Sequence, residues 1–338
     1  MSSKTHVRLR EELAGELRAL DARGLRRSLE ELPAGNFCSN DYLGLANHPQ
    51  LSAALQQGAQ QWGVGSGAAH LVSGHFDAHH QLEQQLAAFV EKPAALLFST
   101  GYMANLGVVQ ALVGKGDTVF ADKLNHASLN DAMLLSRAEV KRFRHGDMAQ
   151  LANYLEQTNG QARFPHLNPL PQAGEEANES LREFSVKCGR KLVITDAVFS
   201  MDGDIAPLRE MLALCERHDA WLYVDDAHGF GVLGEKGCGS LAHFGIASPR
   251  IIYMATLGKA AGVSGAFVAA EQVVVDTLVN HAHSYVYTTA TPPALSVALS
   301  QSLQLIEQGD ALRAHLQQLI TQLRAGLSDL PWQLMPSE

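Results

Sequence analysis

Short apolar runs alternate with amphipathic stretches along most of this chain. Runs rich in Val, Ile, Phe and Tyr that end in polar residues or glycine predict buried strands. Such runs are AALLF, DTVFAD, KLVITDAVFS, WLYVDDAH, RIIYMAT and GAFVAA. The stretches between them have the apolar spacing of helices, as in HHQLEQQLAAFVEK and PLREMLALCERHD. This alternation predicts βαβ units, and therefore an α/β fold with a mostly parallel central sheet flanked by helices.

Other segments extend or interrupt this rhythm. The pattern predicts further helices over residues 8–30, about 49–62 and 295–328, and a strand that begins after Pro331. Residues 161–185 are rich in Pro, Asn, Gly and Glu and show little apolar period, so we expect an inserted surface excursion there. The run GVGSGAAHLVSG predicts a loop. It follows a helix and lacks the GxGxxG spacing, which argues against a dinucleotide site.

The composition describes a soluble globular enzyme. Hydrophobic residues make up 46% and charged residues 18% of 338 residues, enough for one large or two medium domains with a sizeable core. The formal net charge of −9 argues against binding nucleic acid or an anionic membrane. It does not exclude a local basic patch for an anionic substrate.

The cysteines and the first residues indicate the compartment. No pair forms a CxxC motif, so we interpret all four as reduced structural thiols: Cys38, Cys188, Cys215 and Cys238. The N-terminal stretch is charged and lacks the apolar core of a signal peptide. No run reaches the 18 or so apolar residues of a membrane span, so we expect a cytoplasmic protein that does not bind membranes.

An acidic residue and a lysine follow two of the predicted strands. Asp225 ends the apolar run in WLYVDDAHG, and Lys259 follows RIIYM in TLGKAAGVSGA. Polar residues at strand ends are where α/β proteins build their sites. A desolvated lysine loses its charge easily and attacks carbonyls, and a carboxylate opposite a pyridinium nitrogen is the partner that pyridoxal phosphate (PLP) needs. Taken singly, each residue is better explained as a solvated strand end or a turn residue, and only further motifs at fitting positions favour the chemical role.

Five further positions carry candidate chemistry, each with a simpler explanation. Gly101 follows a strand and opens a helix whose N–H groups can bind an anion, although Ser99 or Thr100 would cap that helix in any case. His126 precedes a helix and can stack on a flat heterocycle. His228 follows Asp225 in a glycine-rich connection, Ser200 lies in a turn, and Thr256 offers a hydroxyl to a phosphate.

Three histidines cluster in HFDAHH. His75 and His79 stand four residues apart, and His80 follows directly. A zinc site is conceivable, but we identify no ligating acid or cysteine near them. The spacing favours the start of a surface helix, and no metal site is predicted.

Taken together, the motifs resemble one enzyme family. SNDYLGLANHP, GSGAAHLVSG, STGYMAN, LNHASL, VFSMDGDIAPL, VDDAHGFGVLGEKGCGS, TLGKAAGVSGA and YTTATPPA occur in the order found in the α-oxoamine synthases, PLP enzymes of fold type I. The resemblance runs from about residue 20 to the end, apart from the insertion. Within the family the chain most resembles the branch that condenses L-alanine with pimeloyl-CoA or a pimeloyl carrier protein in biotin biosynthesis.

The resemblance implies roles for particular residues. Lys259 binds PLP covalently, Asp225 pairs with the pyridine nitrogen, and His126 stacks on the ring beside the substrate. His228 and Ser200 lie near the ring hydroxyl. The phosphate is held by Gly101, Tyr102 and Thr256. Arg26 contacts the acyl substrate. The resemblance also implies a homodimer with Thr288 or Thr289 reaching the partner's phosphate.

The same resemblance implies a domain division and two alternatives. We expect an N-terminal helix and loop (1–47), a large PLP-binding domain (48–284) and the start of a small C-terminal domain (285–338). The rest of that domain, with its arginine for the substrate carboxylate, is missing from the sequence, so we expect a fragment or a truncated copy. The alternatives are a related synthase that uses glycine and another acyl-CoA, and a non-catalytic PLP-binding remnant.

Overall fold

The computed structural model describes residues 2–29, 36–158, 189–332, 334–335 and 337. The chain forms two compact units, Met1–Ser39 and Asn40–Glu338. The predicted insertion at 161–185 and Cys188 lie outside the described residues. Cys38, Cys215 and Cys238 are free thiols.

Among its described residues, the N-terminal unit contains one helix, α1 (Ser2–Ala22). The prediction of a helix over residues 8–30 placed its end too late. Gly24 adopts a left-handed φ of +64°, and the Leu25 N–H returns to the Leu20 carbonyl at 2.9 Å. Glycine adopts this conformation at little cost. The hydrogen bond from Leu25 back to Leu20 then ends the helix.

The larger unit is built on a seven-stranded sheet in the order β1-β7-β6-β5-β4-β2-β3. Its strands run parallel from β6 to β3, whereas β7 is antiparallel to both β1 and β6. The prediction of a mostly parallel α/β sheet is confirmed. The strands are β1 (Ala94–Phe98), β2 (Thr118–Asp122), β3 (Glu139–Phe143), β4 (Lys191–Asp196), β5 (Trp221–Asp225), β6 (Ile251–Thr256) and β7 (Ala266–Ala270).

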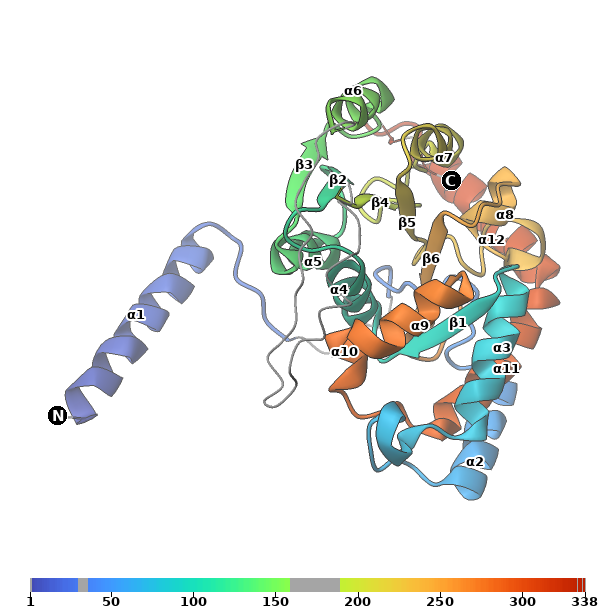
Figure 1. Cartoon of the computed structure of the whole chain (residues 1–338). Coiled ribbons are helices and arrows are strands. Elements are labelled where there is room, and N and C mark those ends of the chain that lie inside the picture. Colours follow the sequence, from blue (N-terminus) through green and yellow to red (C-terminus); the bar gives the residue numbers. More distant parts are fainter. Residues whose placement is uncertain (1, 30–35, 159–188, 333, 336, 338) are drawn as a thin grey trace, which may run out of the picture. The chain divides into compact units, whose positions relative to one another are not determined.

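Helices cover both faces of this sheet (Figure 1). On one face pack α4 (Gly101–Leu112), α5 (Ala127–Ser136), α9 (Gln272–His281) and α10 (His283–Val286). On the other pack α3 (Asp77–Phe89), α6 (Met148–Thr158), α7 (Leu208–Arg217), α8 (Ser240–Phe244) and α11 (Pro293–Glu307). The remaining elements are α2 (Pro49–Trp62), the π-helical turn η1 (His70–Gly74), the 3₁₀ turn η3 (Glu235–Gly237) and α12 (Asp310–Gly326).

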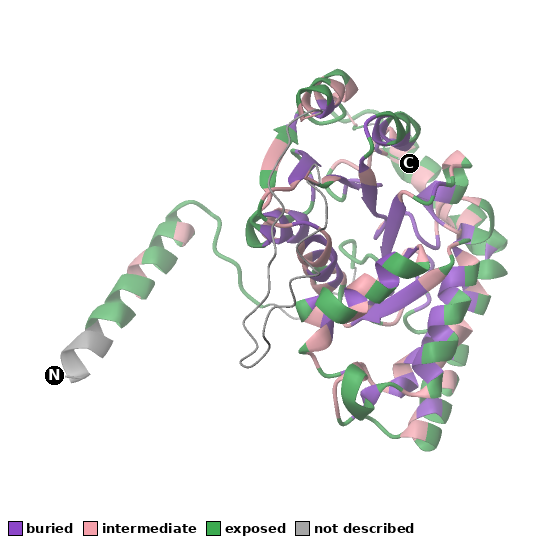
Figure 2. Ribbon diagram, viewed as in Figure 1, coloured by how far each residue is buried: buried purple, intermediate pink, exposed green. Residues whose placement is uncertain are grey.

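The central strands are buried on both sides, as the purple arrows of Figure 2 show. In β5, Leu222 and Val224 belong to the core cluster that also contains residues of α3, α7 and α11, whereas Tyr223 belongs to the cluster with α4 and α9. Side chains that alternate between two covered faces explain why these strands appear as continuous apolar runs in the sequence.

Two expectations about the elements were wrong. The helix predicted over 295–328 is two helices, because the chain bends at Gly309, where an added Cβ would lie 2.8 Å from the Leu305 carbonyl oxygen. Among the described residues after Pro331 there is no strand; Met335 instead accepts a hydrogen bond from Arg324 at 3.1 Å. Within the described residues, no helix combines the length and the apolar character needed to cross a bilayer.

Candidate active site

Four polar residues end neighbouring strands at one edge of the sheet. They are Asp122 on β2, Asp196 on β4, Asp225 on β5 and Thr256 on β6. Because these strands are parallel, their carboxyl ends meet at the same edge. Asp196 and Asp225 are direct register partners, so two carboxylates lie side by side.

Asp225 is held by hydrogen bonds at both carboxylate oxygens. It is 4% exposed, its Oδ2 accepts a bond from Asn105 Nδ2 at 2.8 Å, and its Oδ1 accepts the Ala227 N–H at 3.1 Å. Burial raises the pKa of Asp225, while these bonds and the charge of Lys259 act in the opposite direction. The carboxylate is therefore fixed in place and faces a cation.

The neighbouring Asp226 has a different function in the fold. Its carboxylate accepts the hydroxyl of Ser240 at 2.5 Å and the hydroxyl of Tyr253 at 2.8 Å, and the residue is fully buried. Those contacts tie the chain after β5 to α8 and β6. Of the two aspartates in WLYVDDAH, Asp225 alone is linked to the helix that opens with Gly101.

Asn105 completes this arrangement and was not singled out from the sequence. It is 1% exposed, donates to Asp225 and to the Ser128 hydroxyl, each at 2.8 Å, and accepts the Tyr223 hydroxyl at 2.6 Å. A buried amide with all these partners positions the carboxylate precisely. Its place at the end of STGYMAN was the available signal, since a buried helical Asn needs a partner.

Lys259 lies in the short link between β6 and β7. The link is closed by the Leu257 N–H to the Gly265 carbonyl at 2.8 Å and the Gly262 N–H to the Lys259 carbonyl at 2.9 Å. Burial lowers the pKa of Lys259, and the charges of Asp225 and Asp196 partly oppose this. Its amine is thus brought closer to the neutral, nucleophilic form.

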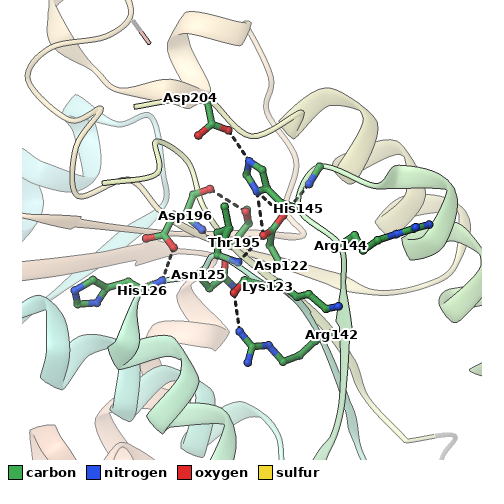
Figure 3. A network of polar contacts seen from close by, with 12 residues as sticks. Asp122, Lys123, Asn125, His126, Arg142, Arg144, His145, Thr195, Asp196 and Asp204 are labelled. Carbon is green, nitrogen blue, oxygen red and sulfur yellow. Dashed lines mark hydrogen bonds and ion pairs between the residues drawn. The ribbon is translucent and has the colours of Figure 1, made fainter. Parts of the chain in front are cut away.

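His126 caps α5 at the same edge of the sheet. Its backbone N–H donates to Asp196 Oδ2 at 2.7 Å (Figure 3). Its Nδ1 lies 2.7 Å from the Ser128 hydroxyl. Burial and the charge of Asp225 raise the pKa of Asp196. Asp196 was overlooked in the sequence because it lies within an apolar run, and only the strand register shows its place.

His228 is half-buried and bonded to Tyr42. The Tyr42 hydroxyl lies 2.6 Å from His228 Nδ1. Burial, and the charges of Lys259 and His126, lower the pKa of His228 to about 4, so its imidazole is neutral near pH 7. Tyr42 fixes the ring but was not predicted as a site residue, although it stands in the quoted SNDYLGLANHP.

The beginning of α4 forms a place for an anion. Thr100 accepts the Met103 N–H through its side chain and the Ala104 N–H through its carbonyl, which leaves the first helical N–H groups, those of Gly101 and Tyr102, for a ligand. A Cβ on Gly101 would lie 2.6 Å from the Thr256 methyl carbon, so only glycine lets the helix approach β6 this closely. Thr256 itself donates to the Ala227 carbonyl at 3.3 Å.

Two predicted residues lack comparable contacts. Ser200 is exposed in the turn after β4. Arg26 belongs to the N-terminal unit, where it pairs with Asp21 at 2.7 Å. Their roles at the site remain predictions, as do those of the other predicted site residues.

Comparisons with known proteins agree with this geometry. The model of the family described as aminotransferase class I and II matches residues 34–338. An 8-amino-7-oxononanoate synthase from Nitrosospira multiformis is 61% identical over 302 residues, which cover 89% of this chain and 69% of that protein. The chain belongs to the class I and II aminotransferases, in the branch of the 8-amino-7-oxononanoate synthases.

Solved structures show the same fold. The crystal structure of an 8-amino-7-oxononanoate synthase from Francisella tularensis is 30% identical with a TM-score of 0.71, and covers 89% of this chain and 78% of that one. A lysine-to-alanine variant of serine palmitoyltransferase from S. paucimobilis, solved with a bound PLP–myriocin aldimine, is 28% identical with a TM-score of 0.79, over 95% of this chain and 80% of that one. The resemblance to a PLP enzyme of fold type I is confirmed.

Proposed function

We propose that the chain uses PLP to condense L-alanine with a pimeloyl thioester, giving 8-amino-7-oxononanoate, CO2 and the free thiol. The observation that supports this most is the lysine of lowered pKa facing a buried carboxylate at the strand ends, in a chain 61% identical to a protein of that name. Biotin biosynthesis, a homodimer and the cytoplasm are the setting we expect for this activity.

The residues at the strand ends suit PLP in charge and shape. The Gly101 and Tyr102 N–H groups and the Thr256 hydroxyl would hold the phosphate at the helix N-terminus. Lys259 would hold the cofactor covalently. Asp225 would keep a proton on the ring nitrogen, since its carboxylate is fixed by Asn105.

PLP, when bound, supplies an electron sink that stabilises a carbanion at the Cα of an amino acid. The protein's part is to move and place the proton. Lys259, once released from the cofactor, would take the Cα proton of alanine as a base, for which a lowered pKa is required. Overall, the Cα of alanine would replace the thiol at the pimeloyl carbonyl carbon and CO2 would leave from that same Cα. Lys259, protonated when it takes the first proton, would return a proton to the carbon.

The two histidines would orient the reacting groups. His126 would stack on the ring and contact the substrate. His228, neutral and fixed by Tyr42, would offer a hydrogen bond to the ring hydroxyl, with Ser200 beside it. Arg26 would contact the acyl chain, and Thr288 or Thr289 of a second copy would reach the phosphate.

The test is a product assay with purified, PLP-loaded protein. We expect 8-amino-7-oxononanoate, identified by mass, from L-alanine with pimeloyl-CoA or the pimeloyl carrier protein. Glycine with other acyl-CoA thioesters, and serine with palmitoyl-CoA, are the competing substrates. Faster turnover of either competitor would refute the proposed substrate pair, and bound PLP without any turnover would favour the non-catalytic alternative.

A further inference from the structure

A second cluster of polar side chains lies where η1 leads into α3, the helix labelled in Figure 1. We propose that His75, His80 and Glu83 bind one divalent transition cation, for which zinc is the best match. One ligand atom from each of these residues lies within 4.8 Å of the others. The histidine spacing alone predicted no metal site, because Glu83, one helical turn after His79, was not considered as a ligand.

The distances suit an ion between the three side chains. His75 Nε2 lies 3.8 Å from Glu83 Oε2, which is too long for a hydrogen bond. Zinc bonds of about 2.0–2.1 Å in tetrahedral geometry place two ligand atoms roughly 3.4 Å apart. His80 and Glu83 stand three positions apart on α3 and share a face, and His75 approaches from the segment before the helix. Small side-chain movements would therefore complete the site.

Glu83 is held in the orientation that a ligand needs. It is 9% exposed, and its Oε1 accepts the Leu97 N–H at 3.0 Å, which leaves Oε2 directed at His75. A buried carboxylate requires a positive partner. Metal-binding carboxylates are commonly fixed by such a hydrogen bond through their second oxygen.

His70 orients His75, another of the proposed ligands. Its Nδ1 lies 2.9 Å from His75 Nδ1, and its ring stacks on Tyr285 with a centroid distance of 5.1 Å and an interplanar angle of 9°. One proton is shared between the two nitrogens. When His75 donates it, the lone pair of His75 Nε2 faces Glu83, which is the tautomer that binds a metal.

His79 belongs to a structural contact instead. Its Nδ1 accepts the Phe76 N–H at 3.0 Å, and its Nε2 lies 2.8 Å from the Thr291 carbonyl oxygen. Both ring nitrogens are thus engaged with the backbone. A second grouping of potential ligands, His70, His75 and His79, is disfavoured for this reason.

The donor set selects the class of ion. Two imidazole nitrogens and one carboxylate oxygen suit zinc and similar cations, whereas magnesium and calcium prefer oxygen ligands throughout. His75 and His80 are exposed, so an ion can enter from solvent. Three protein ligands leave a fourth position for water.

The experiment measures zinc binding to untagged, PLP-loaded protein after treatment with a chelator. Calorimetric titration with ZnCl2 should give one equivalent per chain. His75→Ala, His80→Ala and Glu83→Gln should each weaken binding at least about tenfold, since even the residues that only orient metal ligands contribute 10–100-fold. His281→Ala, which removes an exposed imidazole outside the cluster, is the matched control and should change nothing.

A thermal melt gives a second readout. Zinc should raise the melting temperature of the parent protein and of His281→Ala, but not that of His80→Ala, because binding to the native state stabilises it. His80 is exposed, so its alanine variant stays decisive if Glu83→Gln fails to fold. Equal zinc affinity in the parent and in His80→Ala, or no stoichiometric binding at all, would overturn the proposal.

Discussion

Asp122 and Asp225 are both buried aspartates that end parallel strands of one sheet, yet they are compensated differently. Asp122, at the end of β2, contacts the His145 ring at 3.1 Å and accepts the N–H groups of Leu124 and Gly146 (Figure 3). Asp225, at the end of β5, is bonded to a neutral amide and a backbone N–H, and Lys259 acts on it through its charge.

The two aspartates differ in whether a titratable side chain is hydrogen-bonded directly to the carboxylate. His145 also contacts Asp204 Oδ2 at 2.7 Å through its other nitrogen. Because ionised carboxylates only accept hydrogen bonds, this arrangement favours the imidazole that donates from both nitrogens, and it raises the pKa of His145. Asp122 is thus bonded directly to a fixed imidazole. Asp225 is held in place by neutral donors, and Lys259 acts on it only through its charge, an arrangement that suits the proposed pairing with a ligand.

Removing Lys259, whose charge acts on Asp225, should have the largest effect. In Lys259→Ala we expect no covalent PLP and a fall in turnover of several orders of magnitude, because both the attachment and the base are lost. Borohydride reduction and peptide mapping locate the label. Lys236→Ala, at an exposed ion pair with Glu307, is the control. Label on another lysine in the parent protein would contradict the assignment.

Matched substitutions of the two aspartates test the comparison directly. Asp225→Asn should lower kcat/KM by roughly 10²–10³-fold, by analogy with other electrostatic deletions at reacting centres. Asp122→Asn should instead cost about 1–3 kcal/mol of folding free energy, since it weakens a buried ionic contact. Exchange of the alanine α-proton and urea unfolding measure the two effects. Similar activity losses in both variants would erase the distinction.

Asn105→Ala should moderately lower both the folding stability and the turnover. It leaves the Tyr223 hydroxyl and Asp225 Oδ2 without their buried partner, which costs about 1–3 kcal/mol of stability. We expect turnover to fall about tenfold, because Asp225 is no longer fixed. Asn280→Ala, on the exposed side of α9, should change stability by less than about 0.5 kcal/mol. Unaltered turnover in Asn105→Ala would show that Asp225 needs no support.

The smallest expected effect depends on pH. Burial disfavours the protonated form of His145, but hydrogen bonds to Asp122 and Asp204 outweigh it and raise its pKa. A raised pKa stabilises the fold fully below the unfolded value near 6.5, and the contribution disappears as pH rises through the folded value. The stability gap between the parent and His145→Gln should therefore narrow from pH 6 to pH 8.5 in urea titrations. A stability gap that widens as the pH rises would contradict this prediction.

Much of the fold follows from local patterns, and its exceptions have physical causes. Each strand buried on both faces appears as an apolar run, and these predictions are confirmed. The edge strand β3 was not predicted, because EVKRF is largely polar and pairs on one side only. The break at Gly309 was also missed, since the apolar spacing continues through it.

The residues of the candidate site also fall into two groups, those that the sequence predicts and those that only the fold identifies. Lys259, Asp225, His126 and His228 stand at strand or helix ends that the sequence marks. Asn105, Asp196 and Tyr42 could not be chosen from the sequence, because their importance depends on the partner that the fold brings to them. Similarly, Glu83 becomes a metal ligand only when η1 carries His75 back to α3.

Because β7 runs antiparallel to β6, Lys259 lies in a hairpin link between these two strands. Two parallel strands need a crossover of a dozen or more residues, but the antiparallel pair β6 and β7 is joined by a short hairpin link. That link is fastened at Leu257 and Gly265. Elsewhere in the sheet, a connection can gain residues in evolution without displacing the strands it joins. Here an insertion would shift the lysine itself, so, if Lys259 acts as proposed, we expect the length of this hairpin to be under selection together with the lysine.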